Sequence, residues 1–255
     1  MKLRNFRILA LATIMTLGLT TMTYAASAID GNTGNGSKFV QKQDNKSDPL
    51  TTRQLNLKEK ALNAKLNGKA NGKTYKVAKG QYVELEREGE GAIWTVLGEF
   101  ADLKHNSIAE PDRSVDNSTI WTKDFSRNYY MDLLFNDAPG ANSMHNYYAE
   151  QSSNRYTVTG DVTDWIEVQH NAVYYDDNPD SNVWKFLEDT VNGWYNEQVA
   201  AGKTSAEIKE YLSKLDVRDR YDYDGDGNFN EPDGYIDTFQ SVHAGKSAMD
   251  PGSDV

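Results

Sequence analysis

Cysteine is absent from this 255-residue chain, and histidine occurs only four times. Without cysteine, the chain can form no disulfide, no thiolate zinc site and no cysteine nucleophile. A zinc site built from two or three histidines would have to draw on His105, His145, His170 and His243, and no two of these are close in the sequence. The chain therefore contains no local histidine motif for zinc.

Positive charge is also scarce. The chain has 27 Lys and Arg against 38 Asp and Glu, which gives a formal net charge of −11. This balance argues against a nucleic-acid partner, because phosphate backbones are bound by basic surfaces. The mean hydropathy of −0.72 describes a polar protein. An aromatic content of 11 % nevertheless indicates a packed core rather than a disordered chain.

The first 28 residues have the features of an export signal. Lys2, Arg4 and Arg7 make a positive start, and the apolar stretch from Ile8 to Leu19 is too short to span a membrane. Small residues then offer cleavage positions before residue 29. We predict a secretory signal peptide over residues 1–28 and a secreted, extracellular bacterial protein; an uncleaved N-terminal anchor is the alternative.

The region from residue 29 to residue 91 is mostly polar. Residues 29–47 have no apolar period and predict a flexible leader. Asp48 and the following proline are typical of a helix start, and leucines at near-helical spacing predict an amphipathic helix over Pro49–Asn67. The single apolar stripe of this helix needs a partner surface. Residues 72–91 predict a turn-rich link with a short strand at 82–85.

From residue 92 onward the pattern changes to alternating strands and helices. The apolar run Ala92–Phe100 is typical of a strand buried on both faces. Thr204 followed by Glu207 is a capping box that begins a helix. The remaining elements predicted are helices around 125–138, over 143–151 and over 184–202, strands over 155–162 and 165–168 that pair as a hairpin, a turn at 176–182, and a strand over 235–243. This order predicts an α+β (mixed α/β) fold with a mixed sheet.

The segment from Asp222 to Asp233 matches a calcium-binding loop. Its oxygen-bearing side chains fall at alternate positions, and Gly227 stands at the sixth position, where the backbone must turn sharply. Calcium takes about 6–8 oxygen ligands, which alternating side chains on a tight loop can deliver around one centre. The predicted calcium ligands are Asp222, Asp224, Asp226, Asn228, Asn230 and Asp233.

Two departures from the usual pattern define the kind of calcium loop. Asp233 stands where a longer glutamate usually contributes both oxygens. Pro232 and Gly234 exclude the exit helix of an EF-hand, so the loop should run directly into the strand that follows. We therefore expect a stabilising calcium site rather than a calcium sensor. The alternative is an Asp-Gly turn without a metal.

Several longer segments of the chain carry a family resemblance. They are Gly72–Glu86, Trp94–Asn106, Asn146–Gly160, Trp184–Asp189 and Asp219–Asp237, and the most specific part is the Asp-Gly-Asn-Glu-Pro-Asp block. Over about Pro49 to Gly245, the chain resembles the immune inhibitor A family of secreted bacterial zinc metallopeptidases.

The resemblance implies a zincin-like fold that acts on proteins or peptides, including host defence peptides. It implies a leader and propeptide region over residues 29–91 and the N-terminal part of a catalytic domain over residues 92–255. The calcium loop would stabilise that domain. Independently of the resemblance, the acidic charge balance predicts no nucleic-acid partner, and no stretch after the signal resembles a membrane span, so we expect no membrane association after signal cleavage.

The family's zinc motif, H-E-x-x-H on a helix, is absent from the 255 residues. In the family it follows the strand matched here by Tyr235–His243, and Thr238 stands where the family has a histidine. Zinc is expected for the full-length family, but its ligands are absent here, so no catalytic and no other cofactor-binding residue is assigned. We expect this chain to end before the zinc motif and to be inactive by itself.

Two other functions remain open at the level of sequence. The chain could be a secreted, calcium-stabilised, non-catalytic binding or interaction module derived from such a protease. It could also be one part of an enzyme that a separately encoded second half completes. Calcium-dependent folding without activity would favour the binding module.

Overall fold

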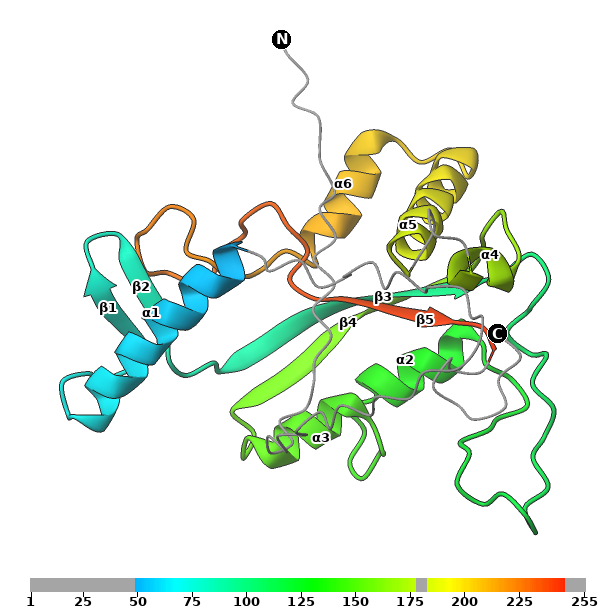
Figure 1. Cartoon of the computed structure of the whole chain (residues 1–255), viewed down its shortest axis with the longest axis horizontal. Coiled ribbons are helices and arrows are strands. Elements are labelled where there is room, and N and C mark those ends of the chain that lie inside the picture. The colour runs from blue at the N-terminus through cyan, green and yellow to red at the C-terminus, as the bar shows by residue number, and fades with distance from the viewer. Residues whose placement is uncertain (1–48, 178–182, 246–255) are drawn as a thin grey trace, which may run out of the picture.

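A computed structural model describes residues 49–177 and 183–245, and a three-stranded parallel sheet runs through its centre (Figure 1). The strands are β3 (Gly89–Glu99), β4 (Tyr156–Glu167) and β5 (Phe239–His243). Their order is β4-β3-β5, so the apolar run predicted to be buried is the central strand. The predicted signal peptide, the flexible leader predicted over residues 29–47 and residues 246–255 lie outside the described residues.

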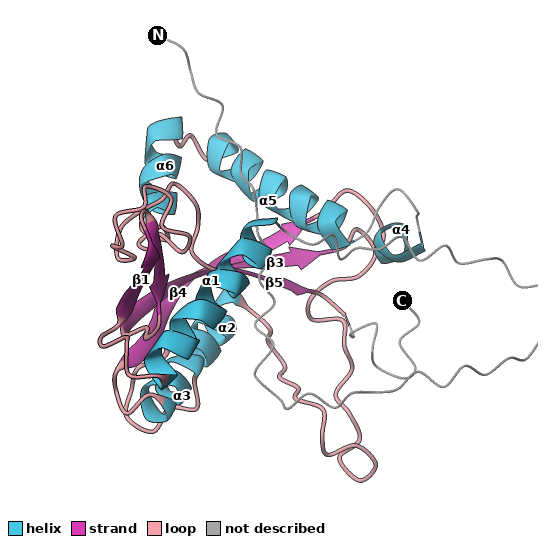
Figure 2. Cartoon of the chain, turned by 60° about the vertical axis from the view of Figure 1, so that its left-hand side comes forward, coloured by secondary structure: helices cyan, strands magenta, loops and turns pink. Residues whose placement is uncertain are grey.

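Helices cover both faces of this sheet. Between β3 and β4 lie α2 (Arg127–Phe135) and α3 (Met144–Gln151); between β4 and β5 lie α4 (Ala172–Asp177), α5 (Val183–Ala200) and α6 (Ser205–Ser213). The chain steps from β3 to β4 in one direction and then back past β3 to β5. Right-handed crossovers in opposite directions place their helices on opposite faces. Figure 2 shows this arrangement, with α5 and α6 across the sheet from α2 and α3.

The central strand contributes to a separate core on each face. Trp94, which is 1 % exposed, belongs to the larger core together with the α5 residues Val191 and Trp194. The Trp94 and Trp194 rings meet edge to face with centroids 4.8 Å apart. Leu97 belongs to the smaller core on the opposite face, where it packs with Leu134 of α2. The sequence prediction of a strand buried on both faces is confirmed.

A glycine allows α5 to approach the sheet closely. A Cβ atom on Gly98 would lie 2.5 Å from Cζ of Phe186 and 2.9 Å from Oγ1 of Thr190. Both neighbours are on α5 and are buried. Any larger side chain at residue 98 would therefore push the helix away from β3.

Residues 49–86, called here the N-terminal unit, pack around a core of their own. α1 (Pro49–Leu66) lies against an antiparallel hairpin of β1 (Thr74–Ala78) and β2 (Gln81–Glu84). Leu57, Ala61 and Val83 are buried between the helix and the hairpin. This hairpin is the partner surface that the apolar stripe of α1 requires. The helix and the second strand were predicted from the sequence, whereas β1 was not.

The hairpin predicted over residues 155–168 is wrong. β4 is one continuous strand that pairs in parallel with β3 along its whole length. The register shifts between Thr95 and Leu97, where β4 carries one additional residue. At this bulge the Leu97 N–H donates to Oγ1 of Thr163 at 3.0 Å. Thr163 and Asp164, which the predicted hairpin leaves between its two strands, therefore lie at a bulge inside one strand.

Two further boundaries differ from the sequence prediction. α4 was not predicted; it extends into the expected turn at 176–182, of which residues 178–182 lie outside the described part. β5 begins at Phe239 rather than Tyr235. The Asp237 N–H donates to the carbonyl of Leu215, just after α6, at 2.9 Å, and only from the Thr238 carbonyl onward, which accepts the Trp94 N–H at 2.8 Å, is the chain bound to β3.

None of the described helices is both long and apolar enough to cross a membrane.

Candidate metal centre

The candidate site is the acidic loop, defined here as residues 216–234, which connects α6 to β5. Asp216 closes its base: one carboxylate oxygen accepts the Asp233 N–H at 3.0 Å, and the other accepts the Gly234 N–H at 2.9 Å. Leu215, immediately before the loop, is 4 % exposed and belongs to the larger core between the sheet and α5, called here the main core. The loop is therefore fixed to the folded domain at both ends.

The middle of the loop is curled by hydrogen bonds in which backbone N–H groups donate to aspartate side chains. Asp222 Oδ1 accepts the N–H of Gly227 at 2.8 Å. Asp224 accepts from the backbone two residues onward at 3.1 Å, and Asp226 does the same at 2.6 Å. Gly227 has a φ of +88°, a conformation that favours glycine. This local geometry turns three aspartates toward a common side, as the spacing of the calcium motif predicts.

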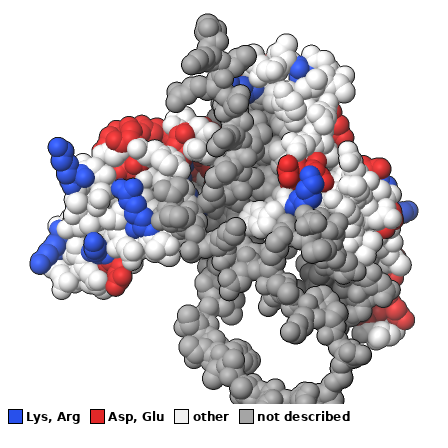
Figure 3. Space-filling view, turned by 45° about the horizontal axis from the view of Figure 1, so that its top comes forward, with Lys and Arg blue, Asp and Glu red and all other residues white. Residues whose placement is uncertain are grey.

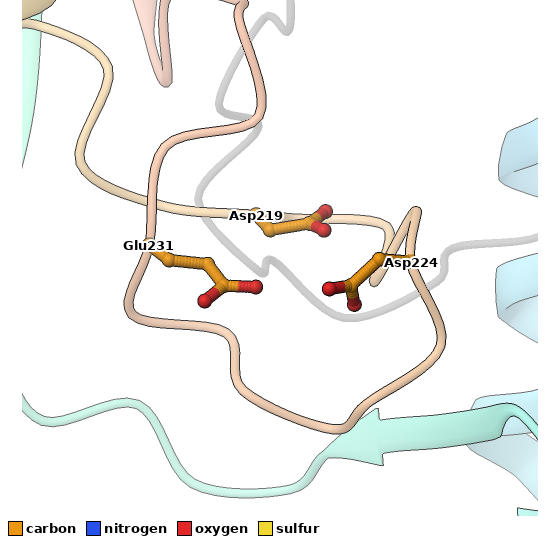
Figure 4. A group of neighbouring side chains, drawn as sticks. All are labelled: Asp219, Asp224 and Glu231. Atoms are coloured by element: carbon orange, nitrogen blue, oxygen red, sulfur yellow. The ribbon is translucent and has the colours of Figure 1, made fainter.

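Two overlapping groups of carboxylates result. Asp222, Asp224 and Asp226 form one group; Asp219, Asp224 and Glu231 form the other, and their side chains point toward one another in Figure 4. Within each group, one carboxylate oxygen from each residue lies within 4.8 Å of the corresponding oxygens of the other two. Oxygens bound to one calcium lie about 2.3–2.6 Å from the ion, so this separation fits a shared cation. Asp224 is common to both groups.

The other three predicted ligands have different contacts. Asn228 donates from Nδ2 to Glu231 at 2.7 Å, and its Oδ1 accepts the Asn230 N–H at 3.2 Å. Asn230 Oδ1 accepts from the Arg87 guanidinium at 2.7 Å. Asp233 belongs to neither carboxylate group and accepts the Tyr235 N–H at 2.9 Å. Their role as ligands remains a prediction.

Two residues in the carboxylate groups were not predicted from the sequence. Asp219 precedes the twelve-residue motif and is only 3 % exposed, with its oxygens accepting the N–H groups of Tyr221 and Tyr223. Glu231 occupies a motif position that usually supplies no ligand. The only sequence feature that could have indicated Asp219 and Glu231 is the high density of carboxylates around the motif, because the motif itself assigns them no ligand position.

The electrostatics of the loop are unfavourable without a cation. Burial, together with the neighbouring Asp216 and Asp219, raises the pKa of Asp233 to about 6. Burial and Asp226 raise the pKa of Glu231 above its usual value. Figure 3 shows acidic side chains gathered over this part of the molecule. A bound divalent cation would reverse these shifts by stabilising the ionised carboxylates.

The histidines do not provide a zinc site in the described part of the chain. His105 Nδ1 lies 2.6 Å from Glu99 Oε2, and its ring stacks on Trp165. His145 and His243 each contact a backbone carbonyl through Nδ1. None of the metal-capable groups among the described residues contains a histidine. The carboxylate groups suit a hard, oxygen-bound cation and do not fit the histidine ligands of a zinc peptidase.

Comparison with known proteins adds to this geometry. A family model described as "Immune inhibitor A peptidase M6, catalytic domain" matches residues 79–254. Immune inhibitor A of Bacillus thuringiensis subsp. alesti is 34 % identical over 164 residues, which are 60 % of this chain and 22 % of that protein. Pre-pro-metalloprotease PrtV from two strains of Vibrio cholerae is 36 % identical over 128 residues, 47 % of this chain and 13 % of that protein.

The matched segments thus span less than a quarter of these curated relatives. The family model nevertheless covers more than half of this chain and includes the whole central sheet and the acidic loop. The α+β architecture predicted from the sequence is confirmed and is that of a zincin-like metallopeptidase domain. The chain belongs to the immune inhibitor A family of metallopeptidases.

Proposed function

We propose that this chain is the front part of a secreted metalloendopeptidase that acts on proteins or peptides. Residues 1–28 would direct export, residues 29–91 would form the leader and propeptide region, and residues 92–255 would contribute the N-terminal part of the catalytic domain. The observation that carries the proposal is the family match over residues 79–254. The similarity to a protein named a pre-pro-metalloprotease supports the same order of segments.

As part of this proposal, the chain does not hydrolyse peptide bonds by itself. Peptidases of this type need histidine ligands for zinc and a glutamate base beside them. The 255 residues contain no H-E-x-x-H, and the carboxylate groups of the acidic loop offer only oxygen ligands. The part of the chain that is described would serve as scaffold and would need zinc ligands supplied by another segment.

The proposed role of the acidic loop is to bind calcium and so stabilise this scaffold. The support is the convergence of carboxylates in two groups that share Asp224, together with the raised pKa values of Asp233 and Glu231. Calcium binds such oxygen clusters and removes the repulsion between their charges. Because Leu215 and the Asp237 backbone join the loop to α6 and β5, ordering the loop would stabilise the main core.

Thermal unfolding with and without calcium tests this role. A cation at about 100 times its Kd stabilises a folded protein by about 2.7 kcal/mol, which is roughly 5–10 °C in Tm for a chain of this size. We expect Asp224→Ala to abolish the calcium-dependent rise in Tm, because Asp224 is shared by both groups.

Asp112→Ala is the matched control. Asp112 is exposed and makes the same kind of turn, accepting the Ser114 N–H two residues onward at 2.9 Å, but it lies outside the acidic loop. It should leave the calcium response unchanged. An Asp224→Ala protein that responds to calcium like the wild type would contradict the proposed site.

A further inference from the structure

The N-terminal unit rests on the acidic loop through two glycines. A Cβ atom on Gly227 would lie 2.6 Å from Cδ1 of Tyr82, so the ring of Tyr82 covers the backbone of the loop there. A Cβ atom on Gly225 would lie 3.2 Å from Cα of Gly80. Both loop glycines have positive φ values, +75° and +88°. Their lack of a side chain thus serves both the turn and the contact with the hairpin.

Polar contacts surround this glycine contact. Glu84 at the end of β2 forms an ion pair with Arg218 and has a side chain that is 11 % exposed. Arg87 pairs with Glu84 at 3.3 Å and donates to Asn230 of the loop. From α1, Gln54 donates to the Tyr221 carbonyl at 3.1 Å. Helix, hairpin and connecting segment therefore all contact the same loop.

The two sides of the acidic loop have different partners. Residues 221, 225 and 227 contact the N-terminal unit. Residues 222, 224 and 226 carry one of the two carboxylate groups. Hydrogen bonds to Asp222 join the two sides: the Gly227 N–H donates to its Oδ1 at 2.8 Å, and the Gly225 N–H donates to its backbone carbonyl at 3.2 Å. A shift of Gly227 away from Tyr82 would therefore move the carboxylate of Asp222.

We propose that docking of the N-terminal unit and binding of a divalent cation to the acidic loop are linked, with Tyr82 acting as a positioning residue for the carboxylate of Asp222. The inference rests on the calcium role proposed above. The docked hairpin holds Gly225 and Gly227 in their turn, so less ordering entropy remains to be lost when the cation binds. The linkage is reciprocal: the cation must favour the docked hairpin by the same factor.

Calcium titration of the whole chain by isothermal calorimetry tests the proposal. We expect Tyr82→Ala to weaken calcium binding by about ten-fold, within the usual range of coupling between sites. Tyr82→Phe keeps the ring over Gly227 and should bind as the wild type does. Equal or tighter binding by Tyr82→Ala would overturn the linkage. If the wild type itself bound no calcium, the proposed calcium role would fail instead.

A second variant and a second measurement cover the case in which Tyr82→Ala does not fold. Glu84→Gln removes the ion pair with Arg218 from the same contact and should also weaken calcium binding. In the wild type, calcium should slow hydrogen exchange of the β1 and β2 amides, although neither strand carries a carboxylate of the two groups. Exchange in β1 and β2 that is the same with and without calcium would contradict the linkage.

Discussion

Asp237, which follows the acidic loop and binds its first residues, shows how a single buried carboxyl can lower the free energy of unfolding. Its Oδ1 accepts the N–H groups of Val217 and Arg218 at 3.2 and 3.1 Å, whereas its Oδ2 is buried without a hydrogen-bond partner in the described structure. Burial raises the pKa of Asp237 to about 6, although the two N–H groups partly oppose the shift. The folded protein therefore retains a proton on Asp237 over a pH range in which the unfolded chain has lost it.

This shift predicts a pH-dependent effect of Asp237→Asn. A carboxyl whose pKa is higher in the folded state makes the free energy of unfolding decrease as pH rises, here from about 4 to about 6. Asparagine cannot ionise and keeps the Oδ1 acceptor. In the presence of a chelator, we expect the Tm of Asp237→Asn relative to wild type to increase as pH is raised from 4 to 7.

The exposed Asp137 provides a control for the charge change alone, since Asp137→Asn removes the same charge between α2 and α3, outside the acidic loop. Its Tm relative to wild type should stay nearly constant over this range. If the Tm difference between Asp237→Asn and wild type did not change with pH, ionisation of the buried Asp237 would not destabilise the folded state, which would contradict the prediction.

At the same scale, the sequence predicted part of the candidate site. Asp222, Asp224 and Asp226 were found because alternate spacing around a required glycine is a local property that the backbone preserves. Asp219 and Glu231 were missed because their approach to Asp224 depends on how the whole loop folds back. Likewise, no sequence pattern indicated that Asn230 would contact Arg87, 143 residues away.

At the scale of helices and strands, local signals succeeded where they were self-contained. The capping box at the start of α6 is confirmed: the Glu207 N–H donates to Oγ1 of Thr204, and the Thr204 N–H donates to the Glu207 carboxylate. The apolar run of β3 and the helical spacing of α1 and α5 also gave the right elements. These signals depend on residues within a few positions of each other.

The failures among strands have a tertiary cause. The predicted hairpin divided β4 into two strands on either side of Thr163 and Asp164, yet the Thr163 hydroxyl accepts the Leu97 N–H and the strand continues through this bulge. β1 was missed because its residues alternate only between exposed and half-buried, which is a weak strand pattern. The strand is stabilised by its pairing with β2 and its packing against α1, neither of which is visible in its own sequence.

The capping box of α6 permits a direct test of element stability. We expect Thr204→Ala to lower the free energy of unfolding by about 1 kcal/mol, because it leaves a helix N–H group without its side-chain acceptor. For a chain of this size this corresponds to a Tm decrease of roughly 2–4 °C.

Ser205→Ala is the matched control, since Ser205 is exposed at the first position of the same helix. Its Tm should remain close to that of the wild type. A Tm decrease as large as that of Thr204→Ala would mean that side-chain polarity, rather than the cap, stabilises this end of α6.

At the scale of the whole molecule, the acidic loop connects the two packed regions. It continues from the main core at Leu215 and contacts the N-terminal unit through Tyr82, Glu84 and Gln54. The sequence predicted the α+β class and the family, but it could not predict this contact. Each partner contributes single residues from distant positions, and none of them forms a local pattern.

We have proposed that this chain forms a calcium-stabilised scaffold of a metallopeptidase and that its zinc ligands come from another segment. The most direct test of this proposal is the metal content of the purified, untagged chain after dialysis against equal concentrations of calcium and zinc, measured by inductively coupled plasma mass spectrometry. We expect stoichiometric calcium and substoichiometric zinc. Stoichiometric zinc, or no bound calcium, would contradict it.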